Sequence, residues 1–221
     1  MALQPIQAVI FDLDGLLVDS EPCWDSVRKA WAVERGVLDW GPEDHRACMG
    51  VNTEVWAQHM TRRLSLELPL EAVIERVVAD MRATYRRAIP YKPGAVAAVA
   101  LAAAHFPVGL ASGSEKSLIE IVVADPALRG KFAAVVCADD MPAGKPAPDV
   151  YLAAARQLGV DPAACVCLED SGAGIQSGKA AGMRVIAVPD PRFPLKPALL
   201  ALADLQLASL EELDLAALRG E

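Results

Sequence analysis

From about residue 95 onward, short apolar segments alternate with segments of helical periodicity, and this alternation constrains the fold most. We expect strands at 107–111, 132–138, 165–169 and 183–188, and helices at 95–104, 115–124, 149–158 and 173–181. The segment LQLASLEEL adds a last strand and helix, and an apolar strand at 8–13 precedes them all. Short apolar strands separated by helices predict a parallel sheet that is covered on both faces.

Residues 20–88 differ, because they show helical periodicity without a good strand candidate. In EAVIERVVADMRATYRRA, for example, Val73, Val77 and Met81 share one face, as in an amphipathic helix. We therefore expect an α/β fold: a doubly wound parallel sheet, or Rossmann-like core, with an inserted all-helical cap domain. The predicted core comprises residues 1–18 and 91–221, and the predicted cap comprises residues 19–90.

Composition restricts the class of partner. With 53% hydrophobic and 23% charged residues, 221 residues can bury a substantial core. The net charge of -8 disfavours binding to nucleic acid or acidic membranes, so we expect a small-molecule partner. We also expect a monomer. We expect neither a secretory signal nor a membrane span, and the five scattered cysteines favour the cytoplasm.

Two aspartates follow the first apolar strand, in FDLDGLLVDS. Asp12 and Asp14 are two residues apart, so on an extended chain their side chains project to the same side. Ligands bind at this end of open parallel sheets. Because two close carboxylates repel each other, a divalent cation is the natural third component. An Asx turn with helix capping would explain one aspartate and not the pair.

Polar residues also follow the later strands. Ser112, Gly113 and Ser114 offer hydroxyls and backbone N–H groups suited to a phosphate, although Ser114 also fits an ordinary helix cap. Lys145 lies in the proline-flanked loop AGKPAPDVY, where a fixed ammonium could neutralise a phosphoryl group or could simply be a surface lysine.

A second acidic pair, Glu169 and Asp170, ends the strand in CLEDSGAG with no basic neighbour in the sequence. If this pair approaches Asp12 and Asp14, the cluster needs a hard cation, and oxygen ligands suit Mg²⁺. All four segments stand at strand ends of one predicted sheet. Their coincidence favours a common site for a small phosphorylated metabolite.

The four segments together resemble the haloacid dehalogenase-like hydrolase superfamily, in the group whose helical cap follows the first strand. FDLDGLLVDS is similar to its first motif, ASGS to the second, GKPAPDVY to the third and LEDSGAGIQSGKAAGM to the fourth. Within that group the chain is most similar to β-phosphoglucomutase-like proteins and to 2-deoxyglucose-6-phosphate phosphatases.

The resemblance implies that Asp12 attacks phosphorus to form an aspartyl-phosphate, while Asp14 protonates the leaving oxygen and then activates water. It implies that Ser112, the Gly113 amide and Lys145 hold the phosphoryl oxygens. It also implies a Mg²⁺ site in the following set: Asp12, the Asp14 carbonyl, Asp170 and Glu169, the last binding directly or through water.

Three positions distinguish branches of the superfamily. Asp14 favours phosphoryl transfer, because the dehalogenases it resembles lack an acid there. Trp24 replaces the histidine of the mutases that the chain resembles, which favours a phosphatase, although Trp24 could equally anchor the cap. Asn52 lies where sugar-phosphate-binding relatives often have arginine, so the far end of the substrate is read differently. Trp24 and Asn52 are therefore the candidate specificity residues.

We expect a Mg²⁺-dependent phosphatase acting on small sugar or polyol phosphate monoesters, with a phosphomutase as the alternative. A receiver-like signalling domain also combines an acidic metal cluster, an aspartate and a lysine, but it would be shorter and would lack the helical insertion. A catalytically silent binding protein is hard to reconcile with the intact set of Asp12, Asp14, Ser112, Lys145 and Asp170.

Overall fold

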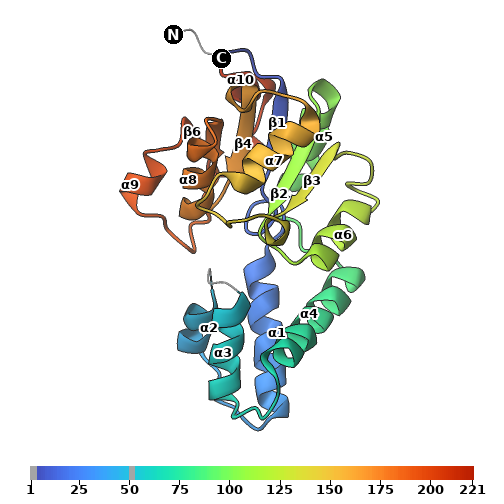
Figure 1. Cartoon of the computed structure of the whole chain (residues 1–221), viewed down its shortest axis with the longest axis vertical. Helices are drawn as coiled ribbons and strands as arrows, with labels where there is room; N and C mark the ends of the chain where they lie inside the picture. Colours follow the sequence, from blue (N-terminus) through green and yellow to red (C-terminus); the bar gives the residue numbers. More distant parts are fainter. Residues whose placement is uncertain (1–3, 50–52) are drawn as a thin grey trace. The chain divides into compact units, whose positions relative to one another are not determined.

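The computed structural model describes residues 4–49 and 53–221, which divide into two units (Figure 1). The first, here called the core unit, consists of Met1–Asp19 and Pro90–Glu221. The second, the helical unit, is Ser20–Ile89. The chain therefore leaves the core unit after Asp19 and returns to it at Pro90.

A parallel sheet with the strand order β3-β2-β1-β4-β5-β6 forms the centre of the core unit (Figure 1). The strands are β1 Ala8–Phe11, β2 Val108–Ser112, β3 Ala134–Cys137, β4 Cys165–Glu169, β5 Arg184–Ala187 and β6 Leu205–Gln206. All residues of β1, β2 and β4 are buried, as expected for strands covered on both faces. The doubly wound α/β fold is thus confirmed. The strand expected at 8–13 ends earlier, at Phe11.

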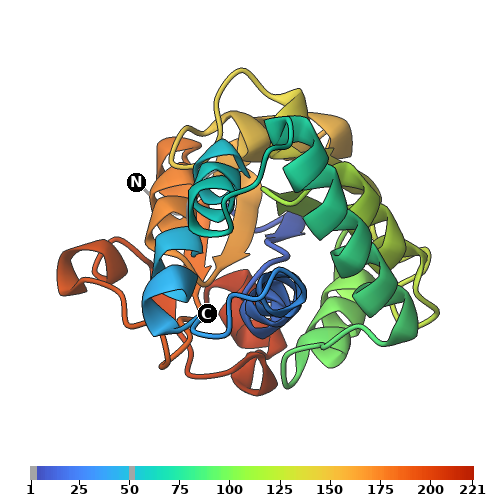
Figure 2. The same ribbon diagram turned by 90° about the horizontal axis from the view of Figure 1, so that it is seen from below.

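Helices cover both faces of this sheet, as the view in Figure 2 shows. They are α5 Ala95–His105, α6 Lys116–Ala124, α7 Asp149–Leu158, α8 Gly172–Ala180, α9 Pro197–Leu200 and α10 Leu215–Arg219, with short 3₁₀ turns η1 Ala138–Asp140, η2 Pro162–Ala164 and η3 Leu210–Glu212. Helix α7 packs on β1, β2 and β3 and contacts α8, whereas α5 packs on β2 and contacts α10. Because the strand order reverses at β1 and β4, their carboxyl ends form the switch point where such sheets bind ligands.

Helices α1 Ser20–Glu34, α2 Pro42–Cys48, α3 Thr53–Arg63 and α4 Leu70–Arg87 build the helical unit. Val73, Val77 and Met81 of α4 are buried, which confirms the predicted apolar face. Asp44 of α2 joins α2 to α3, because its Oδ1 lies 3.0 Å from both His59 Nε2 and Arg63 Nε. This partly buried contact gives His59, which lies outside the four motif segments, a structural role in the helical unit.

The segment by which the chain leaves the core unit is paired with the segment by which it returns. The Asp19 N–H donates to the Pro90 carbonyl (2.8 Å), and the Lys92 N–H donates to the Leu17 carbonyl (2.9 Å). Val18 and Tyr91 form an antiparallel bridge between these bonds. Residues 17–19 and 90–92, where the chain leaves and re-enters the core unit, are therefore held together by backbone hydrogen bonds.

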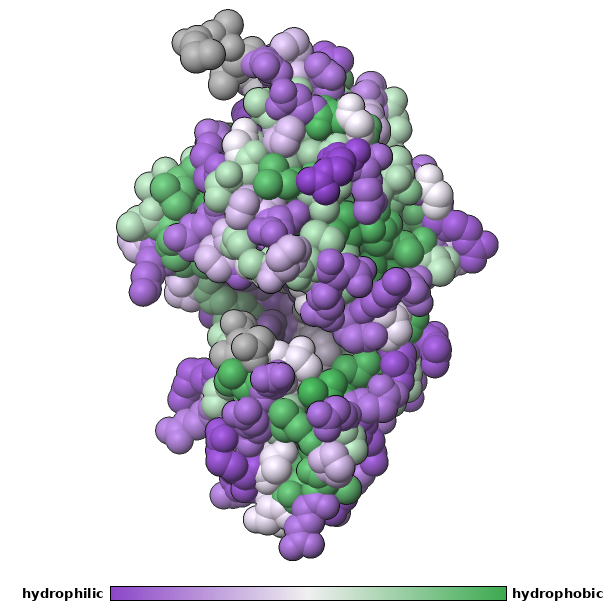
Figure 3. Space-filling model, in the orientation of Figure 1, coloured by the Kyte–Doolittle hydropathy of each residue, from purple (hydrophilic) through white to green (hydrophobic). Residues whose placement is uncertain are grey.

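The surface seen in Figure 3 carries hydrophilic residues over both units, interspersed with hydrophobic ones. Among residues 4–49 and 53–221, no helix has the length and apolar character needed to cross a membrane.

Candidate active site

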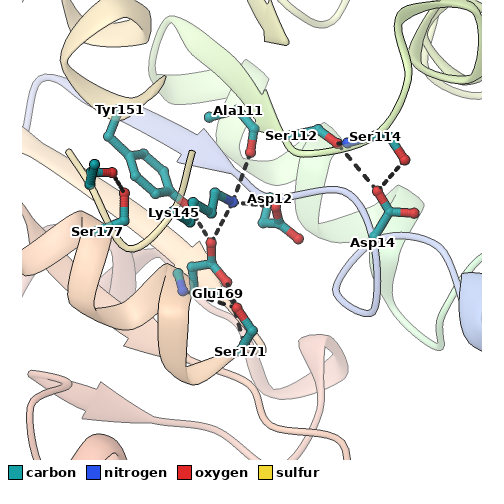
Figure 4. Close-up of polar contacts among 12 residues, drawn as sticks. Asp12, Asp14, Ala111, Ser112, Ser114, Lys145, Tyr151, Glu169, Ser171 and Ser177 are labelled. Atoms are coloured by element: carbon teal, nitrogen blue, oxygen red, sulfur yellow. Dashed lines mark hydrogen bonds and ion pairs between the residues drawn. The ribbon is translucent and has the colours of Figure 1, made fainter. Parts of the chain in front are cut away.

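Asp12 is the first residue after β1, and the structure buries it in the core unit with 5% of its surface exposed. Its Oδ1 accepts a hydrogen bond from Lys145 Nζ at 2.5 Å (Figure 4). Burial raises the pKa of the Asp12 carboxyl to about 8, and the neighbouring Glu169 and Asp14 charges add to this although Lys145 opposes it. A buried carboxylate with one oxygen held by a lysine is a suitable nucleophile once its charge is compensated.

Lys145 uses all three of its N–H donors. Besides Asp12, its Nζ donates to Glu169 Oε1 (2.6 Å) and to the Ala111 carbonyl (3.1 Å). Burial alone would lower the pKa of Lys145, but the Asp12 and Glu169 charges raise it above its ordinary value, so the ammonium stays charged. The lysine is therefore no surface residue, and it supplies the basic partner that the sequence around Glu169 lacks.

Glu169 ends β4 and is fully buried. Its Oε1 also accepts from Tyr151 Oη of α7 (2.6 Å), and its Oε2 accepts from Ser171 Oγ (3.1 Å). A Cβ on Gly174 would lie 1.8 Å from the Glu169 carboxyl carbon, so α8 approaches this carboxylate closely because residue 174 has no side chain. The contacts fix the position of Glu169 in the site.

Asp14 turns to a different set of partners. Its Oδ2 accepts from Ser114 Oγ (2.5 Å) and from Ser112 Oγ (3.2 Å), while Ser112 Oγ accepts the Ser114 N–H (2.9 Å) (Figure 4). Its Oδ1 is buried and has no hydrogen-bond partner among the described residues. Asp14 is thus oriented through one oxygen and has the other available for a further contact.

Gly15 lets Asp170 approach this loop. Its φ of +82° lies in the left-handed region, and a Cβ at this position would be 2.1 Å from Asp170 Oδ2. Asp170 Oδ1 is buried and accepts no hydrogen bond from the described part of the chain. Burial, followed by the Asp12 and Glu169 charges, raises the pKa of Asp170 well above its ordinary value.

Three carboxylates could hold a metal ion. One oxygen each of Asp12, Glu169 and Asp170 lies within 4.8 Å of the others. The unpartnered Asp170 oxygen and the raised pKa values of Asp12 and Asp170 indicate that this group lacks positive charge, despite Lys145. An oxygen-only donor set of this kind fits a hard divalent cation such as Mg²⁺.

The structure thus brings together six of the residues predicted from the sequence: Asp12, Asp14, Ser112, Lys145, Glu169 and Asp170. Gly113 is exposed next to Ser112 in the loop after β2. Of the two specificity candidates in the helical unit, Trp24 packs on Trp56, with the ring centroids 6.1 Å apart, and Asn52 lies outside the described residues.

Two contacts in the site were not predicted from the sequence. Ser114 fits a phosphate-binding loop or a helix cap by sequence, but the cap of α6 is Glu115, which accepts from the Ser117 N–H, and Ser114 Oγ donates to Asp14. Tyr151 follows Lys145 by six residues within GKPAPDVY, yet its contact with Glu169 joins α7 to β4 and has no signal in either segment.

Comparison with known proteins agrees with this geometry. Residues 9–188 match the model of a family described as haloacid dehalogenase-like hydrolase. Hexitol phosphatase B of Escherichia coli K12 is 40% identical over 210 residues, covering 94% of each chain. Fructose-1-phosphate phosphatase YqaB of the same organism is 35% identical, covering 81% of this chain and 95% of that protein.

Among solved structures, CbbY from Rhodobacter sphaeroides in complex with phosphate superimposes with a TM-score of 0.81. It is 28% identical, and the match covers 96% of this chain and 99% of CbbY. The residues matched by the family model, 9–188, include all four motif segments. The chain therefore belongs to the haloacid dehalogenase-like hydrolase family.

Proposed function

We propose that this protein is a phosphatase that hydrolyses small sugar or polyol phosphate monoesters through an aspartyl-phosphate on Asp12. The observation that carries the proposal is the arrangement of Asp12, held by Lys145 at 2.5 Å, beside Asp14 and two further carboxylates. The names of two relatives support the substrate class, since they are a hexitol phosphatase and a fructose-1-phosphate phosphatase.

In the first step, an Asp12 carboxylate oxygen attacks phosphorus and the bond from phosphorus to the ester oxygen breaks. The leaving alkoxide takes a proton from the Asp14 carboxyl, whose orientation is set by Ser112 and Ser114. In the second step, Asp14 removes a proton from water as the water attacks the aspartyl-phosphate. Phosphate leaves, and Asp12 and Asp14 return to their initial states.

Positive charge and N–H donors would stabilise the transferring phosphoryl group. We assign this role to Lys145, the Ser112 hydroxyl and the Gly113 amide. Lys145 is already fixed by three hydrogen bonds, so its charge needs little reorganisation during the reaction.

We propose Mg²⁺ as the cofactor. Asp12, Asp170 and the Asp14 carbonyl would hold it, and Glu169 would contribute directly or through water. When bound, the ion would compensate the carboxylate charges and polarise the phosphoryl oxygens. Both Glu169 oxygens accept hydrogen bonds from protein groups, which favours the water-mediated role for this residue.

We further propose that the helical unit is a cap that closes over the substrate. Exclusion of bulk water would favour transfer to Asp12, and opening would release the products. In this mechanism water hydrolyses the aspartyl-phosphate, whereas a phosphomutase would transfer the phosphoryl group back to its substrate.

The test is phosphate release from hexitol, sugar and glycolate phosphates with and without Mg²⁺, while NMR follows each organic product. We expect Mg²⁺-dependent release from hexitol or sugar phosphates by the wild type, and none from Asp12→Asn. Isomerised sugar phosphate with little free phosphate would make the protein a mutase. Undiminished release by Asp12→Asn would contradict the mechanism.

A further inference from the structure

Asp190, in the segment after β5, is a buried carboxylate of the core unit. Its side chain is 5% exposed and binds two cations. Its Oδ2 accepts from Lys92 Nζ at 2.6 Å and from Arg192 Nη2 at 2.5 Å. Its Oδ1 accepts from Arg192 Nε at 3.0 Å and from the Arg192 N–H at 2.8 Å. Asp190 belongs to none of the four motif segments, and the mechanism above assigns it no part.

The two cations connect this carboxylate to the loop after β1. Arg192 Nη2 also donates to Asp19 Oδ1 at 2.5 Å. The Lys92 N–H donates to the Leu17 carbonyl at 2.9 Å. Asp190 therefore holds the loop at two points, one through each cation.

Backbone hydrogen bonds extend this restraint to Asp14. The Leu17 and Val18 N–H groups both donate to the Leu13 carbonyl, at 2.9 and 3.0 Å. The Gly15 N–H donates to the Val18 carbonyl at 2.8 Å. The residues directly before and after Asp14 are thus bonded to the part of the loop that the two cations hold.

Close packing does not supply the same restraint. A cavity of about 390 Å³ is lined by Gly15 and Leu16 of this loop and also by Asp190 and Pro191 of the segment after β5. Groups that line a cavity have fewer packing contacts on that side. The ion pairs therefore set the position of the loop relative to this segment, and loss of the buried carboxylate would leave the cations without it.

We propose that Asp190 is a positioning residue for Asp14. Through its two cations it holds the loop in which the Asp14 carboxyl can reach the leaving oxygen. An acid must lie within hydrogen-bond reach of the atom that it protonates, and a displacement of about 1 Å can cost on the order of 100-fold in rate. This inference rests on the proposed phosphatase function, because it assigns Asp190 to the acid step of that mechanism.

The test uses two leaving groups that differ in their need for a proton. The alkoxide of a sugar or polyol phosphate needs the proton of Asp14, whereas p-nitrophenolate is a weak base and leaves p-nitrophenyl phosphate without one. We would measure kcat/KM with saturating Mg²⁺ for the wild type, Asp190→Asn and Arg192→Met on hexitol phosphate and on p-nitrophenyl phosphate. This ratio reports formation of the aspartyl-phosphate.

Asp204→Asn is the matched control. Asp204 is also an aspartate of the core unit that accepts from a lysine and from a backbone N–H, those of Lys179 and Val185. It should show what the loss of such an ion pair costs when the aspartate does not bind the loop after β1. Thermal unfolding verifies that each variant is folded.

We expect Asp190→Asn to lose about 10- to 100-fold in kcat/KM on hexitol phosphate and less than about 3-fold on p-nitrophenyl phosphate. Arg192→Met should show the same selectivity with a smaller loss, because Lys92 still binds Asp190. Asp204→Asn should change neither value by more than about 2-fold. Equal losses of Asp190→Asn on the two esters would reveal a structural role and overturn the inference, as would no loss on either.

If Asp190→Asn does not fold, Arg192→Met decides, since the Arg192 side chain is 46% exposed and its loss is easier to accommodate. Amide hydrogen exchange then provides a second measurement. The peptide that covers residues 13–19 should exchange faster in Arg192→Met than in the wild type, while the peptide that covers β4 should not change. Unchanged exchange of residues 13–19 would contradict a positioning role.

Asp14→Asn in the same assay separates this inference from the proposed function. A selective loss on hexitol phosphate in Asp14→Asn, without one in Asp190→Asn, would retain the mechanism and overturn the inference alone. Equal losses of Asp14→Asn on both esters, or no phosphate release from either ester by the wild type, would overturn the mechanism and the inference together.

Discussion

Replacement of Lys145 by methionine should destabilise the metal-free protein strongly and in a pH-dependent manner. Methionine keeps much of the apolar stem but removes the ammonium that contacts Asp12 at 2.5 Å and Glu169 at 2.6 Å. The side chains of these three residues are 12%, 8% and 0% exposed, so solvent cannot replace the lost charge. Removing one partner of such a buried pair costs about 3–5 kcal/mol of unfolding free energy.

The pH dependence follows from Asp12, whose folded-state pKa is raised to about 8. A carboxyl with a raised pKa contributes stability that is full below its ordinary pKa and is lost as the pH rises through the folded-state value. Loss of Lys145 raises the pKa of Asp12 further. Above pH 8 the unfolding free energy of the variant therefore still falls with pH, whereas that of the wild type no longer depends on the titration of Asp12. Between pH 8 and pH 9 this adds about 1.4 kcal/mol to the difference.

Urea unfolding in EDTA at pH 6 and pH 9 measures both effects. We expect Lys145→Met to lose about 3–5 kcal/mol at pH 9 and about 1.4 kcal/mol less at pH 6. Lys131→Met, at an exposed lysine, is the control and should change stability by less than about 0.5 kcal/mol. A loss below about 1 kcal/mol at pH 9, or a loss equal at both pH values, would refute this electrostatic account of the site.

Two other substitutions test separate parts of the core unit. Gly15→Ala brings a Cβ into collision with Asp170 and should raise the Mg²⁺ concentration for half-maximal phosphate release at least 10-fold. Gly36→Ala is the control, because Gly36 has a similar φ of +78° but no atom within 4 Å of the added Cβ, and it should leave this concentration unchanged. Equal effects of the two substitutions would contradict the collision. Asp190→Asn should lower the unfolding free energy at pH 7 by about 2 kcal/mol, because hydrogen bonds from Arg192 hold the pKa of Asp190 well below its ordinary value. That difference should shrink as the pH falls below about 4, and a constant difference from pH 7 to pH 3 would show that charge is not the cause.

Much of the sheet could be predicted because its strands are short apolar runs bounded by polar residues. The strand expected at 165–169 is β4 Cys165–Glu169, and the helix expected at 149–158 is α7 Asp149–Leu158. The end of β1 was placed two residues late, because Leu13 continues the apolar pattern and is buried although it lies outside the strand. A run of apolar residues indicates which residues are buried, and residues beyond the last paired residue of a strand can also be buried.

The site was predictable as a set of residues but not as a set of contacts. Parallel strands bring their carboxyl ends to one edge of the sheet, which is why Asp12 and Glu169 could be expected near each other. Lys145 was expected to serve a phosphate, whereas in the structure it is already bound by both carboxylates. That pairing depends on the path of the loop before α7, which local sequence does not determine.

Long-range packing also explains why the burial of Arg28 in the helical unit, against the indole rings of Trp24 and Trp56, could not be predicted from the sequence. Its position on α1 is typical of an ordinary exposed arginine in an amphipathic helix, and its two aromatic neighbours are 4 and 28 residues away in the chain. The absence of hydrogen-bond partners for Arg28 Nε and Nη1 among the described residues can be recognised only in the folded structure. Such features arise from tertiary structure, and the periodicity of one helix does not contain them.

The central claim, that Asp12 carries the phosphoryl group, is tested most directly by stopping the enzyme with acid during turnover of a hexitol phosphate and mapping phosphorylated peptides by mass spectrometry. The account predicts that the peptide containing FDLDG is phosphorylated at Asp12 in the wild type and that the signal is absent from Asp12→Asn. Phosphate on another residue, or turnover by the wild type with no phosphorylated peptide, would contradict it.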